Sequence, residues 1–337
     1  MPEHTLTRRG LLAAGAAFGV GALLSACGGG DDGGTAPKEG GWSFTDDRGE
    51  KVTTDARPTR IVAYTPTAAA LYDFGVTEGI VGVFGPTTLK DGRPDPMAGR
   101  LPVARMTVLA NTYGEFNIEK YAGLRPEVLI TNTYDPGNLF FLPEDAKEKI
   151  LALAPSLAIK VARVPLPTPI QRYAELAASL GADLKSAQVT AAKARFDRAS
   201  ETLRQAAKAA GGLKVLAGSA SPDLFYVSNP EVNTDLMYFR QLGVDVIVPD
   251  KTDTGGHFES LSWENADKYD ADLILLDSRL SALQPKDLTA KPAWSQLPAV
   301  KAGQIAPWPT EPIFSWAGSA TLVESVAQAV QKSKKVR

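Results

Sequence analysis

The sequence predicts an α/β fold in which two lobes are joined by one long α-helix. The chain has 337 residues with 44% hydrophobic content, enough for two medium domains that each bury a core. Short apolar runs bounded by Gly, Pro and Asp alternate with helical stretches, which is the pattern of parallel strands with helices between them. One helical pattern, much longer than the others, divides this alternation in two.

Six apolar runs are predicted to be buried strands of parallel sheets. Each run is short, rich in Val, Ile or Leu, and bounded by residues that favour turns. Three runs precede the long helix and three follow it. The runs are RIVAY (60–64), GIVGVF (79–84), EVLIT (127–131), KVLAGS (214–219), VDVIV (244–248) and DLILL (272–276).

The long helix is expected over residues 184–210. Asp183 can cap its start and a Gly-Gly pair follows its end. At 1.5 Å per residue it is about 40 Å long. It is either an ordinary amphipathic helix or a rod that joins an N-terminal lobe at 42–183 to a C-terminal lobe at 211–337. Its apolar stripe consists of Val189, Phe196 and Leu203, with Ala192, Ala199 and Ala206 beside them.

The N-terminus has the pattern of an export signal. Arg8 and Arg9 precede an uncharged apolar run at residues 11–26. This run spans about 24 Å as a helix, which is less than the roughly 30 Å of a bilayer core. We therefore expect a signal peptide over residues 1–27 and no spanning helix. The stretch TRRGLL is similar to a twin-arginine motif, and ordinary Sec export remains open.

Cys27 is the only cysteine of the chain and follows the residues LSA. This sequence resembles a bacterial lipobox, in which the thiol receives a lipid; the alternative is a buried structural cysteine. The Gly-rich stretch at 28–41 is predicted to be a flexible tether and offers no core for the thiol. We therefore expect a lipid anchor on the outer face of the cytoplasmic membrane, in an envelope of the Gram-positive type.

The composition argues against several classes of function. The formal net charge of −2 gives no sign of a nucleic-acid partner. His4 and His257 are the only histidines, so His-rich metal sites and Cys-His catalytic pairs are not expected in the folded body. His257 is expected in a loop or at the rim of a site. With no G-x-S-x-G motif either, we expect no enzyme, no resident metal and no cofactor, although a carboxylate-pair glycosidase stays open.

Four segments, in order along the chain, carry a family resemblance. Together they resemble the helix-linked (class III) solute-binding proteins of ABC importers for ferric siderophores, cobalamin and haem. The resemblance covers about residues 44–330. It implies two Rossmann-like lobes with a ligand cleft between them, beyond the carboxyl ends of the strands. The segments are FTDDRGEKVTTDARPTRIVAYTPTAAALYDFGV, FNIEKYAGLRPEVLIT, LSWENADKYDADLILL and PAWSQLPAVKAGQIAPWP.

The resemblance also implies a permease dimer with its ATPase subunits as partner. Glu119 in FNIEKYAGL and Glu264 in LSWENADKY match the family glutamates that dock into arginines of the permease. The alternative is simple helix-start electrostatics, where a Glu is worth a few tenths of a kcal/mol. The chain itself contains no nucleotide-binding motif, and we expect it to be a monomer.

The cleft is expected to hold a ferric hydroxamate siderophore, such as a ferrioxamine or a ferrichrome, with iron bound only inside that complex. A tris-catecholate complex is strongly anionic and would need several cations around one point. The predicted strand ends are instead rich in aromatic residues, which suit a bulky, nearly neutral or weakly cationic ligand. The alternatives are cobalamin or haem, a directly bound metal ion, and a surface-tethered hydrolase.

The candidate ligand-binding residues lie at or near the predicted strand ends. The segments PAWSQLPAVKAGQ and FSWAGSATL resemble the ferric-hydroxamate branch, which implies that Trp316 and Tyr134 are pocket residues. Tyr113 stands where that branch has an arginine, so contacts to the hydroxamate oxygens are expected from Arg105 or Arg279. The full set is Tyr64, Phe84, Arg105, Tyr113, Tyr134, Phe225, Tyr226, Arg279, Trp308, Phe314 and Trp316.

Overall fold

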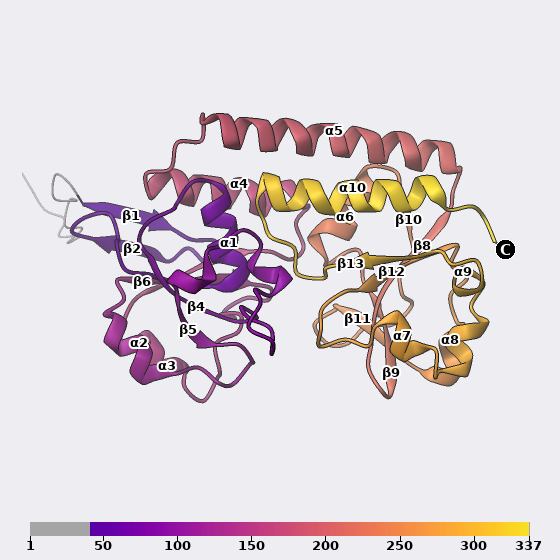
Figure 1. Cartoon of the computed structure of the whole chain (residues 1–337), viewed down its shortest axis with the longest axis horizontal. Helices are drawn as coiled ribbons and strands as arrows, with labels where there is room; N and C mark the ends of the chain where they lie inside the picture. The colour runs from indigo at the N-terminus through magenta and orange to yellow at the C-terminus, as the bar shows by residue number, and fades with distance from the viewer. Residues whose placement is uncertain (1–40, 337) are drawn as a thin grey trace, which may run out of the picture. The chain divides into compact units, whose positions relative to one another are not determined.

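The structure is a computed structural model that describes residues 41–336. Within this range two lobes of helices and strands follow one another along the chain, which confirms the predicted α/β class. Helix α5 (Ala187–Ala210) leads from the first lobe to the second (Figure 1). Nowhere in residues 41–336 is there a helix long and apolar enough to cross a membrane.

The N-terminal lobe is built on a five-stranded parallel sheet and a small antiparallel pair. Its strands are β1 (Trp42–Thr45), β2 (Lys51–Thr54), β3 (Ile61–Tyr64), β4 (Ile80–Phe84), β5 (Thr107–Ala110), β6 (Val128–Thr133) and β7 (Ser156–Lys160). The parallel sheet has the order β5-β4-β3-β6-β7, and β1 pairs with β2. All residues of the central strand β3 are buried, as expected for a strand covered on both faces.

Short connections turn these strands into helices. Tyr64 ends β3 and is also the N-cap of α1, whose first turn contains Pro66. Proline is favoured there because its fixed φ suits the first helical turn and its missing N–H costs nothing. The helices of this lobe are α1 (Thr65–Asp73), α2 (Ile118–Leu124), α3 (Lys147–Leu151) and α4 (Pro167–Ser179), with short 3₁₀ turns η1 (Pro96–Ala98) and η2 (Val103–Arg105).

The C-terminal lobe has a mixed sheet. Its strands are β8 (Lys214–Ala220), β9 (Leu224–Ser228), β10 (Asp245–Val246), β11 (Phe258–Ser262), β12 (Leu273–Asp277) and β13 (Ile305–Trp308). The order is β11-β9-β8-β12-β13, and β10 also pairs with β8. Strands β8, β10 and β12 are parallel, as predicted, and β13, which was not predicted, is parallel to β12; β9 and β11 are antiparallel. Only residues 221–223 separate β8 from β9, too few for a crossover, so the chain turns straight back.

The predicted strand at 244–248 is reduced to the two residues of β10. The helices that complete this lobe are short except for the last one. They are α6 (Thr234–Gln241), α7 (Pro285–Leu288), α8 (Pro292–Gln296), α9 (Pro298–Lys301) and α10 (Trp316–Lys332), with a 3₁₀ turn η3 (Trp263–Asn265).

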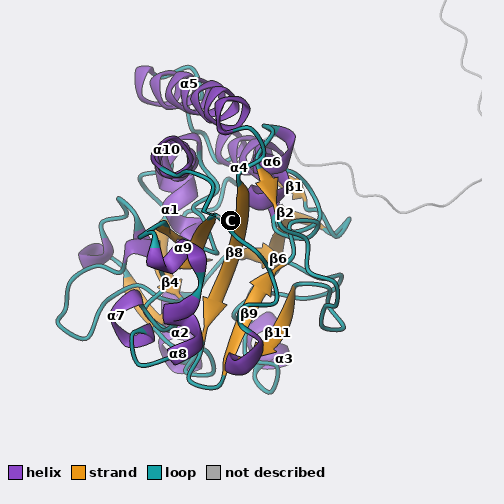
Figure 2. Ribbon diagram, turned by 90° about the vertical axis from the view of Figure 1, so that its right-hand side faces the viewer, coloured by secondary structure: helices purple, strands orange, loops and turns teal. Residues whose placement is uncertain are grey.

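Helix α5 starts three residues later than predicted. Its N-cap is Ser186, whose Oγ accepts a hydrogen bond from the N–H of Val189 at 3.4 Å, and not Asp183. It ends at Gly211 with φ of 59°, the left-handed conformation that glycine adopts without strain. The predicted stripe of Val189, Phe196 and Leu203 is buried. Helix α10 lies beside α5 in both views (Figures 1 and 2).

A single hydrophobic cluster extends through both lobes. It includes Ile61 and Val128 of the N-terminal sheet, Leu203 of α5, and Leu275 and Val323 of the C-terminal lobe. Each lobe has in addition a smaller cluster of its own, on the other face of its sheet. The two lobes therefore share one hydrophobic core and are not joined only by a linker.

Candidate functional site

Side chains from the two lobes meet beyond the carboxyl ends of β3 and β12. The hydroxyl of Tyr64, the last residue of β3, donates to Oε2 of Glu311 at 2.5 Å. Glu311 lies in the loop between β13 and α10, and its other oxygen accepts from Arg279, just after β12. One carboxylate thus joins the two lobes at the edge where open α/β sheets bind ligands.

Arg279 is held by two carboxylates. Its Nη2 and Nε donate to Asp277 at 2.8 and 3.1 Å, and its Nη1 donates to Glu311. Asp277 is fully buried and also accepts from Ser219 Oγ at 2.8 Å. Burial opposes the charge of Arg279, but its bonds to Asp277 and the charge of Glu311 outweigh burial and raise its pKa above the ordinary value. The cluster of Asp277, Arg279 and Glu311 contains two carboxylates and one guanidinium, so its formal charge is −1.

Two tyrosines beside this cluster stay protonated. Burial raises the pKa of Tyr64 and Tyr134 well above the usual value, and the negative charge of Glu311 raises both further. The Tyr134 hydroxyl is buried with no hydrogen-bond partner among the described residues, and so is Oγ1 of Thr310. A buried phenol without a partner is unfavourable by about 1–3 kcal/mol, so both groups are suited to a polar ligand atom.

Aromatic rings from the loop after β6 cover Tyr64. Phe141 stacks on it with ring centroids 5.5 Å apart, and Phe140 meets it edge-on at 5.4 Å. Phe140 also lies 4.6 Å from the ring of Tyr134, and Phe141 lies 5.7 Å from that of Tyr113. Phe141 has φ of 66°, a strained value for a bulky side chain. Strained residues of this kind cluster at ligand sites.

Each lobe has one large, exposed hydrophobic side chain near this cluster. Tyr113 is 60% exposed in the N-terminal lobe, and Leu280, directly after Arg279, is 65% exposed in the C-terminal lobe. Such side chains, together with Phe141, which contacts Tyr113, can cover the methylene and ring surface of a ligand. The cluster can therefore accept a molecule that is largely apolar outside and carries a few hydrogen-bonding oxygens.

A second contact between the lobes lies next to this cluster. Arg163 donates to the carbonyl oxygen of Tyr134 and to Asp135 Oδ1, both at 2.9 Å, and to the carbonyl oxygen of Gly255. His257 Nε2 lies 3.1 Å from the other oxygen of Asp135. Burial favours a raised pKa for Asp135, but His257 and Arg163 outweigh it and hold the pKa below its usual value. His257 thus lies in a loop and contacts a carboxylate.

The structure brings together part of the predicted ligand-binding set. Tyr64, Tyr134 and Arg279 lie in or beside the polar cluster, and Tyr113 joins it through Phe141. Tyr226 is directly opposite Ser219 on β8 and packs edge-on against Phe258 at 5.1 Å. Phe84 is fully buried behind Tyr64, at 6.0 Å between ring centroids.

The other predicted residues lie in different surroundings from the ligand wall that we expected. Phe225 packs in the C-terminal core against Trp263 and Trp294, because it faces the opposite side of β9 from Tyr226. Trp308 is fully buried and donates to Asp235. Phe314 stacks on Tyr173 at 6.3 Å. Arg105 is exposed in η2, without an ion pair to the described residues.

Trp316 is likewise used for packing between helices. As the first residue of α10 it lies 5.1 Å from the ring of Phe196 on α5, and Lys193 Nζ is 5.3 Å from its ring. Phe140, Phe141 and Glu311 were not predicted from the sequence. The two phenylalanines could have been found as an aromatic pair shortly after a strand end, but nothing local distinguishes Glu311 from other acids in loops.

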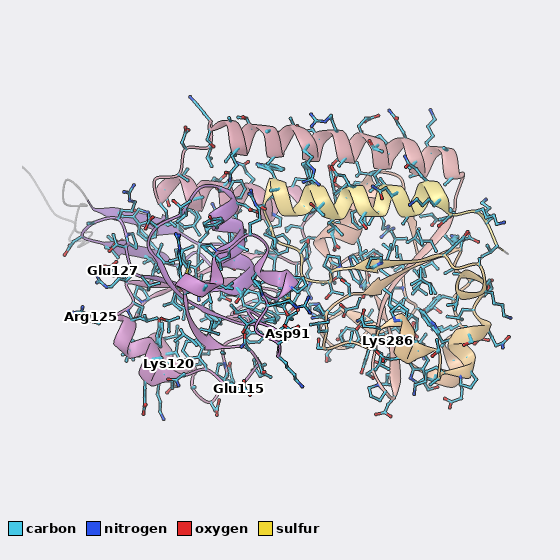
Figure 3. The ribbon with its side chains drawn as sticks, viewed as in Figure 1. Asp91, Glu115, Lys120, Arg125, Glu127 and Lys286 are labelled. Atoms are coloured by element: carbon cyan, nitrogen blue, oxygen red, sulfur yellow. The ribbon has the colours of Figure 1, made fainter. Side chains whose placement is uncertain are left out.

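The two glutamates predicted to contact a permease occupy matching local positions. Glu119 is the second residue of α2 after the N-cap Asn117, and Glu264 is the second residue of η3 after the N-cap Ser262. Both are exposed. Lys120, next to Glu119, lies on the side of the N-terminal lobe away from α5 (Figure 3). Backbone and Ser262 hydrogen bonds lower the pKa of Glu264, so it is ionised at neutral pH.

Among residues 41–336, no group of three or more His, Cys, Asp or Glu is arranged to hold a metal ion. The predicted lipid-attachment residue, Cys27, lies outside the described residues.

Comparison with protein families gives one match. Residues 61–312 match the family described as periplasmic binding protein, which is most of the chain. A search of curated protein sequences gave no match to this chain.

Solved structures give further matches. DesE, a ferric-siderophore receptor protein from Streptomyces coelicolor, is 54% identical, with 88% of this chain and 100% of DesE covered and a TM-score of 0.84. FeuA from Bacillus subtilis, solved with ferri-bacillibactin, is 16% identical, with 87% and 99% covered and a TM-score of 0.63. The petrobactin-binding protein YclQ of the same organism is 14% identical, with 87% and 99% covered and a TM-score of 0.64. The last two show a shared fold.

Proposed function

Because this chain belongs to the periplasmic binding protein family, we propose that it is a receptor that binds a ferric siderophore outside the cytoplasm and delivers it to an ABC permease. The observation that carries this is the 54% identity to DesE, described as a ferric-siderophore receptor, over 88% of this chain. The family and the structural neighbours are solute-binding receptors, and this chain is not an enzyme.

The ligand in this proposal is a ferric hydroxamate of the ferrioxamine type. Support comes from the charge and surface of the site. The cluster of Asp277, Arg279 and Glu311 has a net negative charge, which disfavours a strongly anionic tris-catecholate complex. The aromatic and aliphatic side chains around it suit methylene linkers, and the unpartnered Tyr134 hydroxyl can donate to a hydroxamate oxygen.

Titration of ferric siderophores against the intrinsic fluorescence of the five tryptophans tests this. We expect a linear or cyclic ferric trihydroxamate to quench with sub-micromolar affinity, and free Fe(III) and a ferric tris-catecholate to leave the signal unchanged. Equal quenching by both siderophore classes would refute the charge argument. Tight binding of cobalamin or haem, with no response to siderophores, would mean that the chain is a receptor for those ligands instead.

Permease docking is assigned to Glu119 and Glu264. Their exposure and matching positions in the two lobes support this, because a permease dimer presents the same surface twice. Replacing both by Ala should leave ligand affinity intact and abolish uptake in cells. The exposed pair Glu78 and Glu201, replaced in the same way, is the control and should leave uptake unchanged. A large loss of ligand affinity in the first variant would contradict the assignment.

The location and organisation of the chain complete the proposal. Residues 1–27 are the export signal, Cys27 carries the lipid, and residues 28–41 are the tether. The mature protein is a monomer with lobes at 42–183 and 211–337, connected by residues 184–210.

In cells fed a labelled fatty acid, the native chain should be labelled and membrane-bound, and a Cys27→Ser variant should be neither. Replacing Arg8 and Arg9 by Lys distinguishes the two export routes, since only twin-arginine export should fail.

A further inference from the structure

Glu311 is the carboxylate of the cluster that accepts hydrogen bonds from both lobes. Asp277 is saturated: it accepts from Ser219, from the N–H of Arg279 at 2.9 Å and from the Arg279 guanidinium, all within the C-terminal lobe. Glu311 instead reaches Tyr64 of the N-terminal lobe with one oxygen and Arg279 with the other. Without Glu311, Asp277 and Arg279 would be a neutral pair, so Glu311 supplies the excess negative charge.

The surroundings of Glu311 strengthen the effect of that charge. Its side chain is 12% exposed and that of Arg279 is 32% exposed, so water screens the cluster poorly. Tyr64 and Tyr134 face it as neutral phenols. Arg163 and His257 both contact Asp135. They are therefore paired with that carboxylate and do not neutralise the charge of Glu311.

The unpartnered hydroxyls next to the cluster indicate where a ligand would lie. Tyr134 Oη lies in the field of Glu311 and is buried without a hydrogen-bond partner, and Thr310, whose Oγ1 has none either, precedes Glu311 in the chain. Arg279 engages all three of its nitrogens, yet Nη1 and Nη2 each retain one N–H. These two N–H groups can donate to a ligand oxygen while Glu311 keeps its bond to Arg279, and a ligand held there lies within the field of the Glu311 charge.

We propose that Glu311 sets the charge selectivity of this site, so that among ferric trihydroxamates a cationic complex binds more tightly than a neutral one and an anionic complex binds least. This inference rests on the proposed function, since it concerns which siderophore of that class is preferred. The chemical class it names is a linear ferric trihydroxamate with a protonated amine at one end. A negative charge kept close to the ligand in poorly screened surroundings discriminates between ligands of equal shape by their charge.

The test uses three ligands that differ only at that terminus: a linear ferrioxamine with its free amine, its N-acetyl derivative and its N-succinyl derivative. At neutral pH their ferric complexes are cationic, neutral and anionic. We expect native protein to bind them in that order of decreasing affinity. Glu311→Gln keeps the size of the side chain and one acceptor oxygen for Arg279, its amide N–H can donate to the Tyr64 hydroxyl, and the charge is removed. It should weaken the cationic complex and strengthen the anionic one, each by about tenfold relative to the neutral complex.

Two variants serve as controls. Glu311→Asp keeps the charge and should retain the native order, and Glu201→Gln removes an exposed carboxylate on α5 and should retain native affinities. If Glu311→Gln does not fold, the test is the order of the three ligand affinities, measured in native protein and in Glu311→Asp. Equal binding of all three ligands by native protein, or an unchanged ratio in Glu311→Gln, overturns the inference and leaves the ligand class standing. Failure of every trihydroxamate to bind overturns both.

Discussion

At the scale of single residues, one buried carboxyl group, that of Asp235, makes stability depend on pH. Asp235, in the first turn of α6, is fully buried and accepts from Trp308 Nε1 at 2.5 Å. Burial raises its pKa to about 6, although the bonds from Trp308 and from backbone N–H groups act in the opposite direction. The folded protein therefore holds a proton between about pH 4 and pH 6 that the unfolded chain releases.

Asp235→Asn should remove this pH dependence. In native protein the raised pKa makes the free energy of unfolding fall as pH rises from about 4 to 6, by up to about 3 kcal/mol, and then level off. Chemical denaturation at several pH values should show the variant gaining by that amount relative to native protein across this window. Asp223→Asn, at an exposed aspartate, is the control and should follow the native pH profile. Parallel profiles for Asp235→Asn and native protein would contradict the prediction.

Trp316→Ala separates packing from ligand contact. Because Trp316 packs between α10 and α5, its loss should lower the free energy of unfolding by about 2 kcal/mol and leave siderophore affinity unchanged. Trp316→Phe should recover most of the stability. A folded Trp316→Ala variant whose siderophore affinity falls more than tenfold would restore the pocket role that the family resemblance implied.

At the scale of elements, the start of α10 is tied to the N-terminal lobe. Ser315 is its N-cap: Oγ accepts from the N–H of Gly318 at 3.0 Å and donates to Asp73 of α1 at 2.5 Å. Asp73 is also held by Arg100 at 2.7 Å. This junction fixes the helix that follows the Glu311 loop, and so positions that loop.

Ser315→Ala should cost about 1–2 kcal/mol of stability, because a buried cap and a hydrogen bond to a carboxylate are lost together. Ser333→Ala is a matched control at the other end of α10, where the hydroxyl only donates to the carbonyl oxygen of Ala329. It should cost a few tenths of a kcal/mol at most. Equal effects in urea denaturation would show that the link between Ser315 and Asp73 contributes nothing.

At the scale of the whole molecule, the shared core and the contacts between lobes couple the two halves. The hydrophobic cluster is continuous from Ile61 to Leu275, and Tyr64 with Glu311 adds a polar link at the ligand edge. We expect residues 41–336 to unfold in one cooperative transition, with equal calorimetric and van't Hoff enthalpies. Leu129→Ala and Leu276→Ala, each in the separate cluster of one lobe, should lower the same midpoint. Two resolved transitions, each sensitive to one variant, would show independent lobes.

Much of the fold could be predicted from the sequence, because apolar runs and helical periodicity are properties of short segments. Val62 and Leu129 lie in short, continuous apolar runs, which are typical of strands buried on both faces, and the stripe of α5 repeats with the helical period. The errors were local too. Ser186 rather than Asp183 caps α5, although both residue types can do so; Asp183 Oδ1 instead accepts from the N–H of Lys185 in the turn before the helix.

By itself, the sequence determined the α/β class, the long connecting helix, the family and the aromatic character of the strand ends. Only the tertiary structure decided which side chains meet. Tyr64 and Glu311 are 247 positions apart, and no periodicity relates residues at that separation. For the same reason, the contacts of Trp308, Phe314 and Trp316 with residues of α6, α4 and α5 could not be predicted. An aromatic residue near a strand end has two directions to face, and only packing selects one.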